Sequence, residues 1–460
     1  MAEHTINRRA FVRDSLLSLG GILGLTKALG VGAFIGGCGN PRRAAGKKHD
    51  WPNIILIMAD DLGYGDLGCY GNTRIKTPNI DALAKAGMRF TDYHSNGAVC
   101  SPTRAALLTG RYQQRCGVEE VIAAKGPLRQ TGMPLTEVTF AEILKRAGYA
   151  TGIFGKWHLG YKVEFNPVRQ GFDEFRGYVS GNVDYHSHID GAGIADWWKN
   201  LEKVPEEGYV TDLITAAAVD FIERHKDEPF CLYVPHEAVH YPYQGRNDPP
   251  ERLPGGRRGK RTEGPEIQRA YKEMVEVMDE GIGRVVETVR RLGLERRTFI
   301  FFCSDNGATR RGSNGPLNGF KASLWEGGHR VPAVAYWPGR IKPGTLCNQT
   351  VLGMDLLPTM ASITGAELPA GLKLDGVDLS GLLFAGKKLP KRTLFWRFGK
   401  QKVARKGPWK LLVQGEKIML FNLDDDLGEK NDLAGEKPGI VKALRDELAA
   451  WERDVDGTRG

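Results

Sequence analysis

The sequence predicts an α/β fold followed by a small α+β domain, and three observations support this prediction. Continuous apolar runs at residues 53–59, 230–234 and 298–304 are typical of strands buried on both faces of a sheet. Helical patterns lie between these runs, and the longest, at residues 267–292, carries an apolar stripe along one side. After residue 379 the composition changes, and residues 390–423 look like short antiparallel strands followed by a helix.

The length and composition allow two domains. With 460 residues, 41% of them hydrophobic and 26% charged, the chain has the composition of an ordinary globular protein with a large core. We expect a main domain at residues 52–370 and a smaller α+β domain at residues 371–460. The net charge of +9 weakly favours an anionic partner. No zinc-finger or helix-turn-helix pattern supports nucleic acid, so we expect none.

The first 38 residues are predicted to be an export signal, and residues 39–51 a polar, basic linker. The run Asn7-Arg8-Arg9-Ala10-Phe11-Val12 resembles a twin-arginine signal. Ile35-Gly36-Gly37-Cys38 resembles a lipobox, in which Cys38 is lipidated after cleavage and tethers the protein to a membrane. The alternative is a plain signal peptide without lipid. Both interpretations predict a periplasmic or cell-surface protein.

Polar side chains follow two of the predicted buried strands. Asp60 and Asp61 end the first strand, where adjacent carboxylates repel each other and lose hydration. A divalent cation that prefers oxygen ligands, calcium or magnesium, would relieve this repulsion, whereas a solvated turn is the alternative. Asp305 and Asn306 follow residues 298–304. Because sites form at the carboxyl ends of strands in open α/β sheets, these four residues are a candidate metal site.

Cys100 lies just before a predicted helix. Ser101 suits the N-cap, Pro102 the first helical position and Gly110 the end. Unpaired N–H groups and the helix dipole favour an anion there, and Arg104 lies one turn further on. This arrangement suits attack on an anionic ester. The alternative is a helix whose cysteine is buried as a small apolar residue.

Three histidines follow other predicted strands. Lys156 and His158 come after residues 149–154 and point the same way if the chain stays extended. A cation beside an imidazole suits anion binding and proton transfer, whereas an exposed loop pair is the alternative. His236 and His240 follow residues 230–234, and both are candidates for protonating a leaving group.

The segment 172–198 is rich in aromatic residues, histidine and aspartate. We favour sugar recognition by stacking and hydrogen bonds, with a His186-x-His188 metal clip or a packed surface loop as alternatives. Among the seven cysteines, Cys69 and Cys116 could pair, but no disulfide scaffold is indicated.

Several motifs resemble those of one family, the type I sulfatases of the alkaline phosphatase superfamily, and in particular the arylsulfatases and N-acetylgalactosamine sulfatases. One motif resembles the first signature of the family: Cys100-Ser101-Pro102-Thr103-Arg104 followed by Ala105-Ala106-Leu107-Leu108-Thr109-Gly110-Arg111. A later motif resembles the second signature: Gly155-Lys156-Trp157-His158-Leu159-Gly160. His240-Tyr241-Pro242 resembles the element of the family's catalytic histidine, and Lys321 matches its sulfate-binding lysine. His236 has no such match.

The resemblance implies the fold and the residue roles. It implies an alkaline-phosphatase-like fold, with a central mostly parallel sheet flanked by helices and a small C-terminal antiparallel sheet with a helix. A formylglycine-generating enzyme would convert Cys100 to formylglycine, whose hydrated aldehyde is the nucleophile. Calcium would be held by position 100 with Asp60, Asp61, Asp305 and Asn306. Lys156, Lys321 and Arg104 would neutralise sulfate, His240 with Lys321 would protonate the leaving alcohol, and His158 would assist sulfate release.

The predicted function is therefore calcium- and formylglycine-dependent hydrolysis of sulfate monoesters. The expected substrate is a sulfated carbohydrate or an aryl sulfate, and inorganic sulfate is released. Two alternatives remain open. One is a phosphodiesterase or phosphonate hydrolase on the same fold, and the other is a non-catalytic lipoprotein that binds sulfated glycans.

Overall fold

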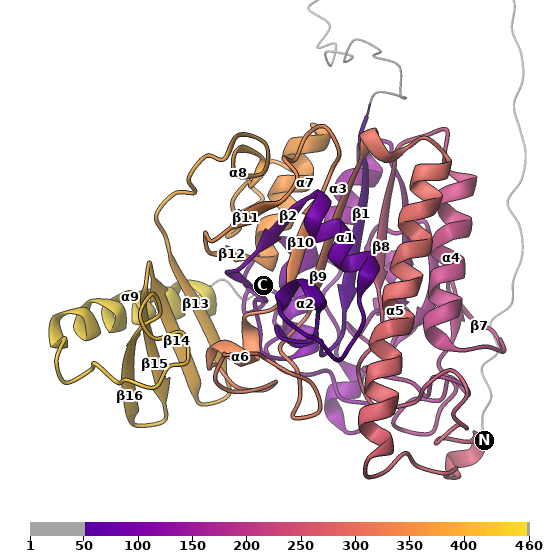
Figure 1. Ribbon diagram of the computed structural model, residues 1–460, viewed down its shortest axis with the longest axis horizontal. Helices are drawn as coiled ribbons and strands as arrows, with labels where there is room; N and C mark the ends of the chain where they lie inside the picture. Colours follow the sequence, from indigo (N-terminus) through magenta and orange to yellow (C-terminus); the bar gives the residue numbers. More distant parts are fainter. Residues whose placement is uncertain (1–50, 458–460) are drawn as a thin grey trace, which may run out of the picture. The chain divides into compact units, whose positions relative to one another are not determined.

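A ten-stranded mixed sheet forms the centre of the computed structural model, which describes residues 51–457. The strand order is β11-β2-β10-β9-β1-β8-β4-β5-β6-β7. The strands are β1 (Asn53–Ala59), β2 (Met88–Phe90), β4 (Ala150–Lys156), β5 (Glu174–Tyr178), β6 (Trp198–Lys199), β7 (Glu202–Lys203), β8 (Phe230–Pro235), β9 (Thr298–Ser304), β10 (Ala333–Tyr336) and β11 (Thr345–Cys347). The five inner strands from β9 to β5 are parallel, and antiparallel pairs involve β10, β6 and β7 (Figure 1). The predicted α/β class is confirmed.

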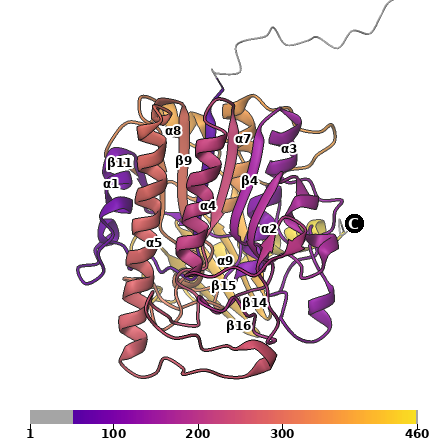
Figure 2. The same cartoon turned by 90° about the vertical axis from the view of Figure 1, so that its right-hand side faces the viewer.

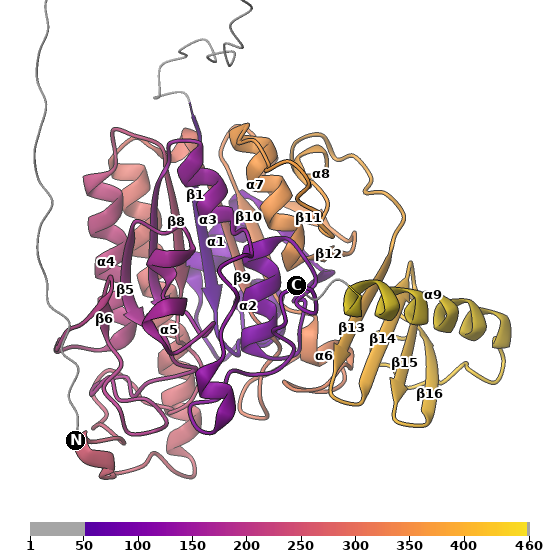
Figure 3. The ribbon, with the colours of Figure 1, turned by 180° about the vertical axis from the view of Figure 1, so that it is seen from behind.

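Helices cover both faces of this sheet. The helices are α1 (Pro78–Ala86), α2 (Cys100–Thr109), α3 (Phe140–Arg146), α4 (Val210–Arg224), α5 (Glu266–Arg291) and α7 (Leu356–Thr364). Figure 2 shows α4 and α5 side by side against one face, and Figure 3 shows α2, α3 and α7 against the other. Alternate residues of β1 enter the two cores, with Ile54 and Leu56 in one and Ile55 and Ile57 in the other. This explains the continuous apolar run of the strand.

The parallel arrangement brings the ends of three strands to one edge of the sheet. Ala59 pairs with Ser304, and Met58 pairs with Pro235, so β1, β9 and β8 end at nearly the same level. Their carboxyl ends are followed by the predicted polar residues of the sequence. The site is therefore a consequence of the parallel register.

A second sheet follows near the C-terminus. Its four antiparallel strands lie in chain order, β13 (Thr393–Phe398), β14 (Gln401–Lys406), β15 (Trp409–Gln414) and β16 (Lys417–Asn422), and α9 (Pro438–Asp456) packs beside them (Figure 3). Trp396 donates its indole N–H to the Ser95 carbonyl over 2.9 Å, and Arg405 pairs with Asp92 at 2.8 Å. The predicted small α+β unit is confirmed, whereas the boundary between residues 370 and 371 stays a prediction.

The remaining elements are short. They are β3 (Tyr93–His94), β12 (Val351–Leu352), α6 (Glu326–His329), α8 (Ser380–Ala385) and the 3₁₀ helices Gly68–Tyr70, Pro127–Gln130, Val163–Phe165, Pro167–Gln170, Pro254–Gly256, Glu295–Arg297 and Gly353–Asp355. Among the described residues, no helix combines the length and apolarity needed to cross a bilayer. Cys69 and Cys116 are both free thiols, so the pairing considered for them is not made. The predicted twin-arginine signal and lipobox lie outside the described residues.

Candidate active site

The helix α2 places Cys100 at the edge of the sheet. The helix starts at Cys100 itself, with Val99 as the N-cap, two residues earlier than predicted. The prediction of a Ser101 cap is wrong because the Ser101 hydroxyl instead accepts the Ile122 N–H over 3.1 Å. Gly110 ends the helix with φ 66°, as predicted. Cys100 is buried, with 1% of its surface exposed.

Arg104 reaches the acidic residues from the next turn of α2. Its guanidinium donates to Asp305 over 2.9 Å and to the Lys156 carbonyl over 3.1 Å, and it lies 3.8 Å from the Asp60 carboxylate. Arg104 is 1% exposed. The guanidinium therefore ties the helix to the ends of three strands, β1, β4 and β9.

Asp60, Asp61, Asp305 and Asn306 form one buried cluster, as the sequence predicts. The Asp61 N–H donates to Asp305 over 3.1 Å, and the Asn306 amide donates to Oδ1 of Asp61 over 2.7 Å. Asp61 has φ 60°, in the left-handed region that non-glycine residues seldom adopt. The backbone after β1 thus turns sharply into the site.

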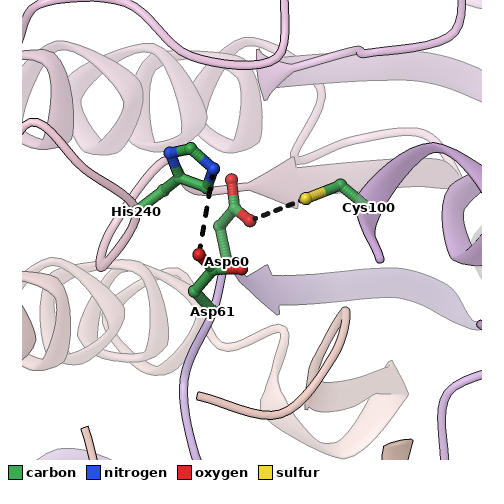
Figure 4. Close-up of side chains that lie close together, drawn as sticks. All are labelled: Asp60, Asp61, Cys100 and His240. Carbon is green, nitrogen blue, oxygen red and sulfur yellow. Dashed lines mark hydrogen bonds and ion pairs between the residues drawn. The ribbon is translucent and has the colours of Figure 1, made fainter. Parts of the chain in front are cut away.

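Two oxygen atoms of this cluster indicate a cation site. Oδ2 of Asp61 and Oδ1 of Asn306 are buried, and neither accepts a hydrogen bond from a described residue. Ligand atoms of Asp60, Asp61, Cys100 and His240 lie within 4.8 Å of one another, and Figure 4 shows the four side chains converging. Buried carboxylate and amide oxygens without donors fit a hard divalent cation such as calcium. His240 was expected beside this cluster as a proton donor and is close enough to be a ligand.

Cations surround the carboxylates. Lys156 pairs with Asp60, and Lys321 lies 2.6 Å from Oδ1 of Asp61 and 3.4 Å from Sγ of Cys100. Burial, and then the charge of Asp305, raise the pKa of Asp60 to about 7. Burial likewise raises the pKa of the Cys100 thiol, so the unmodified side chain is a protonated thiol at neutral pH. An unmodified Cys100 is therefore a poor nucleophile here.

The two histidines of the predicted site lie on different segments. His158 has φ 58°, so the chain does not stay extended through it, which was the condition for Lys156 and His158 to point the same way. Its Nε2 instead lies 3.1 Å from the Ile122 carbonyl oxygen. Nε2 of His240 lies 3.8 Å from Oδ2 of Asp61, and its Nδ1 lies 2.8 Å from the Tyr241 carbonyl. Burial, and then the charges of nearby lysines, hold the pKa of both imidazoles well below the usual value.

His236 is as deeply buried as the acidic cluster. It is 1% exposed, and burial lowers the pKa of its imidazole to about 4. Of the two histidines after β8, His240 is the one whose ring nitrogen lies close to the acidic cluster, 3.8 Å from Oδ2 of Asp61.

The aromatic segment 172–198 does not offer stacking surfaces. Tyr185, Trp197 and Trp198 are 0%, 3% and 6% exposed, so their rings pack inside the protein. Nε2 of His186 contacts the Gly245 carbonyl, and Nε2 of His188 contacts the Gly208 carbonyl. The prediction of sugar stacking by these rings is therefore wrong, and the packed-loop alternative describes the segment.

The sequence analysis missed two groups near the site. The Ile122 carbonyl, which contacts His158, is a main-chain group and has no residue-type signal. Glu237 is fully buried, accepts the Val183 N–H over 2.7 Å, and has a pKa raised well above its usual value by burial. Its position next to His236 in a polar run after a strand was the available signal.

Comparison with known proteins identifies the family. The sulfatase family model matches residues 52–366 of this chain. The chain belongs to the sulfatase family. It is 39% identical to arylsulfatase A of Bos taurus over 386 residues, which cover 75% of this chain and 70% of the relative. It is 35% identical to N-acetylgalactosamine-6-sulfatase of Mus musculus over 370 residues, which cover 75% and 69% of the two chains.

Solved structures agree with this assignment. The crystal structure of Ps i-CgsB in complex with k-i-k-neocarrahexaose superposes with a TM-score of 0.79 at 30% identity, covering 89% of this sulfatase and 94% of that chain. The protein is thus a type I sulfatase of the alkaline phosphatase superfamily and a sulfuric ester hydrolase, as the motifs predicted. Family membership supports sulfate ester hydrolysis over a phosphodiesterase, a phosphonate hydrolase or a non-catalytic binding protein.

Proposed function

We propose that this sulfatase hydrolyses sulfate monoesters of a carbohydrate, with calcium and with formylglycine at position 100. The observation that carries the proposal is the convergence of Cys100, the acidic cluster and three cations at one edge of the sheet. A carbohydrate substrate is supported by the relative that acts on N-acetylgalactosamine 6-sulfate and by the neighbour bound to a neocarrahexaose. The net charge of +9 favours an anionic substrate.

The proposed calcium ligands are Asp60, Asp61, Asp305, Asn306 and the side chain at position 100. This set of ligands is supported by Oδ2 of Asp61 and Oδ1 of Asn306, which accept no hydrogen bond from a described residue. When bound, calcium supplies positive charge that polarises a sulfate oxygen and lowers the pKa of a nearby nucleophile.

The proposed nucleophile is a modified residue 100. The raised pKa of the Cys100 thiol supports a requirement for conversion. Formylglycine supplies a hydrated aldehyde as an oxygen nucleophile, and a formylglycine-generating enzyme is then a maturation partner.

The remaining roles follow from charge and position. Lys156, Lys321 and Arg104 already balance buried carboxylates, and they would neutralise the sulfate as its charge redistributes. His240, with Lys321, would donate a proton to the leaving alcohol. His158, oriented by the Ile122 carbonyl, would transfer a proton during sulfate release.

We also propose that the protein is exported by the twin-arginine route and acts in the periplasm or at the cell surface. The motif at residues 7–12 and the lipobox-like segment ending at Cys38 support this proposal. Fractionation of the native host and labelling of Cys38 with a fatty-acid probe test the two parts separately.

Sulfate and phosphate esters of one alcohol test the function. The matured enzyme should release sulfate from 4-nitrophenyl sulfate much faster than phosphate from 4-nitrophenyl phosphate. Cys100→Ala should lower the sulfatase rate by about 10³-fold or more, because the nucleophile is lost. Cys116→Ala is the matched control, since Cys116 is also a buried free thiol. A faster phosphatase rate, or an active Cys100→Ala variant, would contradict the proposal.

A further inference from the structure

A cavity of about 690 Å³ lies beside Lys321. Its walls include Thr309, Arg310, Phe320, Lys321, Ser323 and Trp325. Since Lys321 also contacts Asp61 and Cys100, this cavity adjoins the acidic cluster on the side of the residues proposed to protonate the leaving alcohol. The organic part of a sulfate ester held at Cys100 would therefore lie in this space.

Arg310 lines this cavity with a guanidinium group that is available to bind an anion. Its guanidinium carbon lies 4.9 Å from the centre of the Phe320 ring, a cation–π arrangement. In the part of the chain that the structure describes, Arg310 has no carboxylate partner, and its side chain is exposed. An arginine held on an aromatic face loses less conformational freedom when it binds an anion than one that is free in solvent.

Hydrogen bonds fix the two walls of the cavity relative to each other. The Lys321 N–H donates to the Ala308 carbonyl over 2.9 Å. The Asn314 side chain accepts the Ala308 N–H over 2.9 Å and donates to the Gly319 carbonyl over 3.0 Å. The segment that carries Arg310 is therefore held next to the segment that carries Lys321.

A further hydrogen bond joins this wall to the His240 segment. The Thr309 hydroxyl lies 3.1 Å from the Tyr243 hydroxyl, three residues after His240. Arg310 is thus positioned relative to both His240 and Lys321, the two groups proposed to act on the leaving alcohol.

We propose that this cavity binds the leaving sugar and that Arg310 binds a second anionic group on it. The preferred substrate is then a sugar that carries a sulfate or carboxylate in addition to the sulfate that is cleaved. The guanidinium fork can donate two hydrogen bonds to either oxyanion, and Phe320 and Trp325 offer apolar surface to the sugar ring. This inference rests on the proposed function, because it adds a second anionic group to the sulfated carbohydrate that is proposed as the substrate.

Two variants of adjacent arginines test the inference. Arg310→Gln removes the charge but keeps much of the stem over Phe320. Arg311→Gln is the matched control, because Arg311 is also exposed but does not line the cavity. The substrates are N-acetylgalactosamine 6-sulfate and N-acetylgalactosamine 4,6-disulfate, which differ only in the second anionic group.

For Arg310→Gln, KM for the disulfate should rise about tenfold more than KM for the monosulfate, as expected for one charge-assisted contact at a solvent-accessible site. Arg311→Gln should leave the ratio of the two KM values unchanged. Equal changes for both sugars, or the same change of ratio in Arg311→Gln, would overturn the inference.

A binding measurement separates this inference from the proposed function. Calorimetry with the Cys100→Ala protein measures the Kd of the disulfate without turnover. If adding Arg310→Gln raises this Kd about tenfold, the anion site stands even when the matured enzyme hydrolyses neither sugar, and only the proposed function fails. An unchanged Kd, beside measurable binding by the Cys100→Ala protein, overturns the Arg310 site whatever the activity.

Discussion

The ammonium group of Lys321 lies 2.6 Å from Oδ1 of Asp61. The lysine comes from the loop between β9 and α6, and the aspartate follows β1, so the contact joins segments 260 positions apart in the sequence. The same ammonium group lies 3.4 Å from Sγ of Cys100. Lys321 therefore links Asp61, a proposed calcium ligand, to the proposed nucleophile. The charge of Asp61 can be tested independently of turnover.

Calcium should stabilise the folded protein through Asp61. At a free calcium concentration 100 times the Kd, the free energy of unfolding of chelator-treated protein should rise by about 2.7 kcal/mol, because calcium binds only the folded state. Asp61→Asn should lose most of this increase, measured as the shift of thermal unfolding on adding calcium.

Asp66→Asn is the matched control for the calcium experiment. Asp66 is another buried carboxylate after β1, but it accepts hydrogen bonds from the Gly63 N–H and the Tyr271 hydroxyl. Its variant should keep the calcium-dependent shift even if it is less stable. An equal shift in Asp61→Asn and wild type would argue against the assigned ligands.

His240→Ala should slow poor leaving groups more than good ones. Proton donation matters most when the departing alcohol is weakly acidic, so hydrolysis of a sugar sulfate should fall by about 10²-fold or more. Hydrolysis of 4-nitrophenyl sulfate should fall much less. The measurement is kcat/KM for both esters, and equal losses would count against His240 as the proton donor.

His236 should make the protein less stable in acid. Burial lowers the pKa of its imidazole to about 4, whereas the usual value is about 6.5, so the unfolded state binds the proton more readily. The stability contributed by neutral His236 is fully present above pH 6.5 and is lost as the pH falls towards 4. That loss is about 3 kcal/mol. His236→Phe should therefore lose less stability than wild type between pH 7 and pH 4.5 in urea unfolding.

His225 provides a control of opposite sign. Hydrogen bonding to Glu174 raises the pKa of His225, so its stabilising contribution is present at low pH and is lost as the pH rises through the raised pKa. His225→Gln should lose more stability on acidification than wild type. If His236→Phe and His225→Gln change the pH dependence in the same direction, burial of His236 is not the cause.

Lys410 should contribute strongly to the free energy of unfolding, because it helps to hold the C-terminal sheet against the main part of the protein. It is fully buried and pairs with Glu326 at 2.9 Å and Glu429 at 2.7 Å. Lys410→Met leaves two buried carboxylates without their shared cation, and should cost about 3–5 kcal/mol of unfolding free energy.

Lys406→Met is the matched comparison for Lys410. Lys406 pairs with Glu447 at 2.7 Å, but its side chain is 55% exposed. Loss of such a surface pair should cost about 1 kcal/mol or less. Urea unfolding of both variants measures the difference, and similar small losses would show that the buried pair contributes little.

The buried strands could be predicted because their sequence pattern is local. Residues 53–59 and 298–304 are apolar throughout since both faces of β1 and β9 are covered by helices. Polar residues that directly follow such strands meet at one edge of the sheet, which made Asp60, Asp61, Asp305 and Asn306 recognisable as one cluster. The strands of the C-terminal sheet, from β13 to β16, likewise lie within the predicted residues 390–423.

Other features depend on contacts that a single sequence does not reveal. Ser101 has the residue type of a helix cap, but its hydroxyl is occupied by the distant Ile122 N–H. The composition of residues 172–198 suits sugar binding, yet the exposure of Tyr185 and Trp197 is decided by packing. The pair of Lys410 with Glu326 spans 84 positions and has no local signal.

The mass of the peptide that contains residue 100 tests the proposed nucleophile most directly. The protein should be purified from its native host, so that its own maturation enzyme is present, and assayed with 4-nitrophenyl sulfate from the same preparation. In active enzyme, this peptide should carry an aldehyde in place of the thiol. An intact Cys100 thiol throughout a preparation that hydrolyses the ester at full rate would contradict the proposed nucleophile.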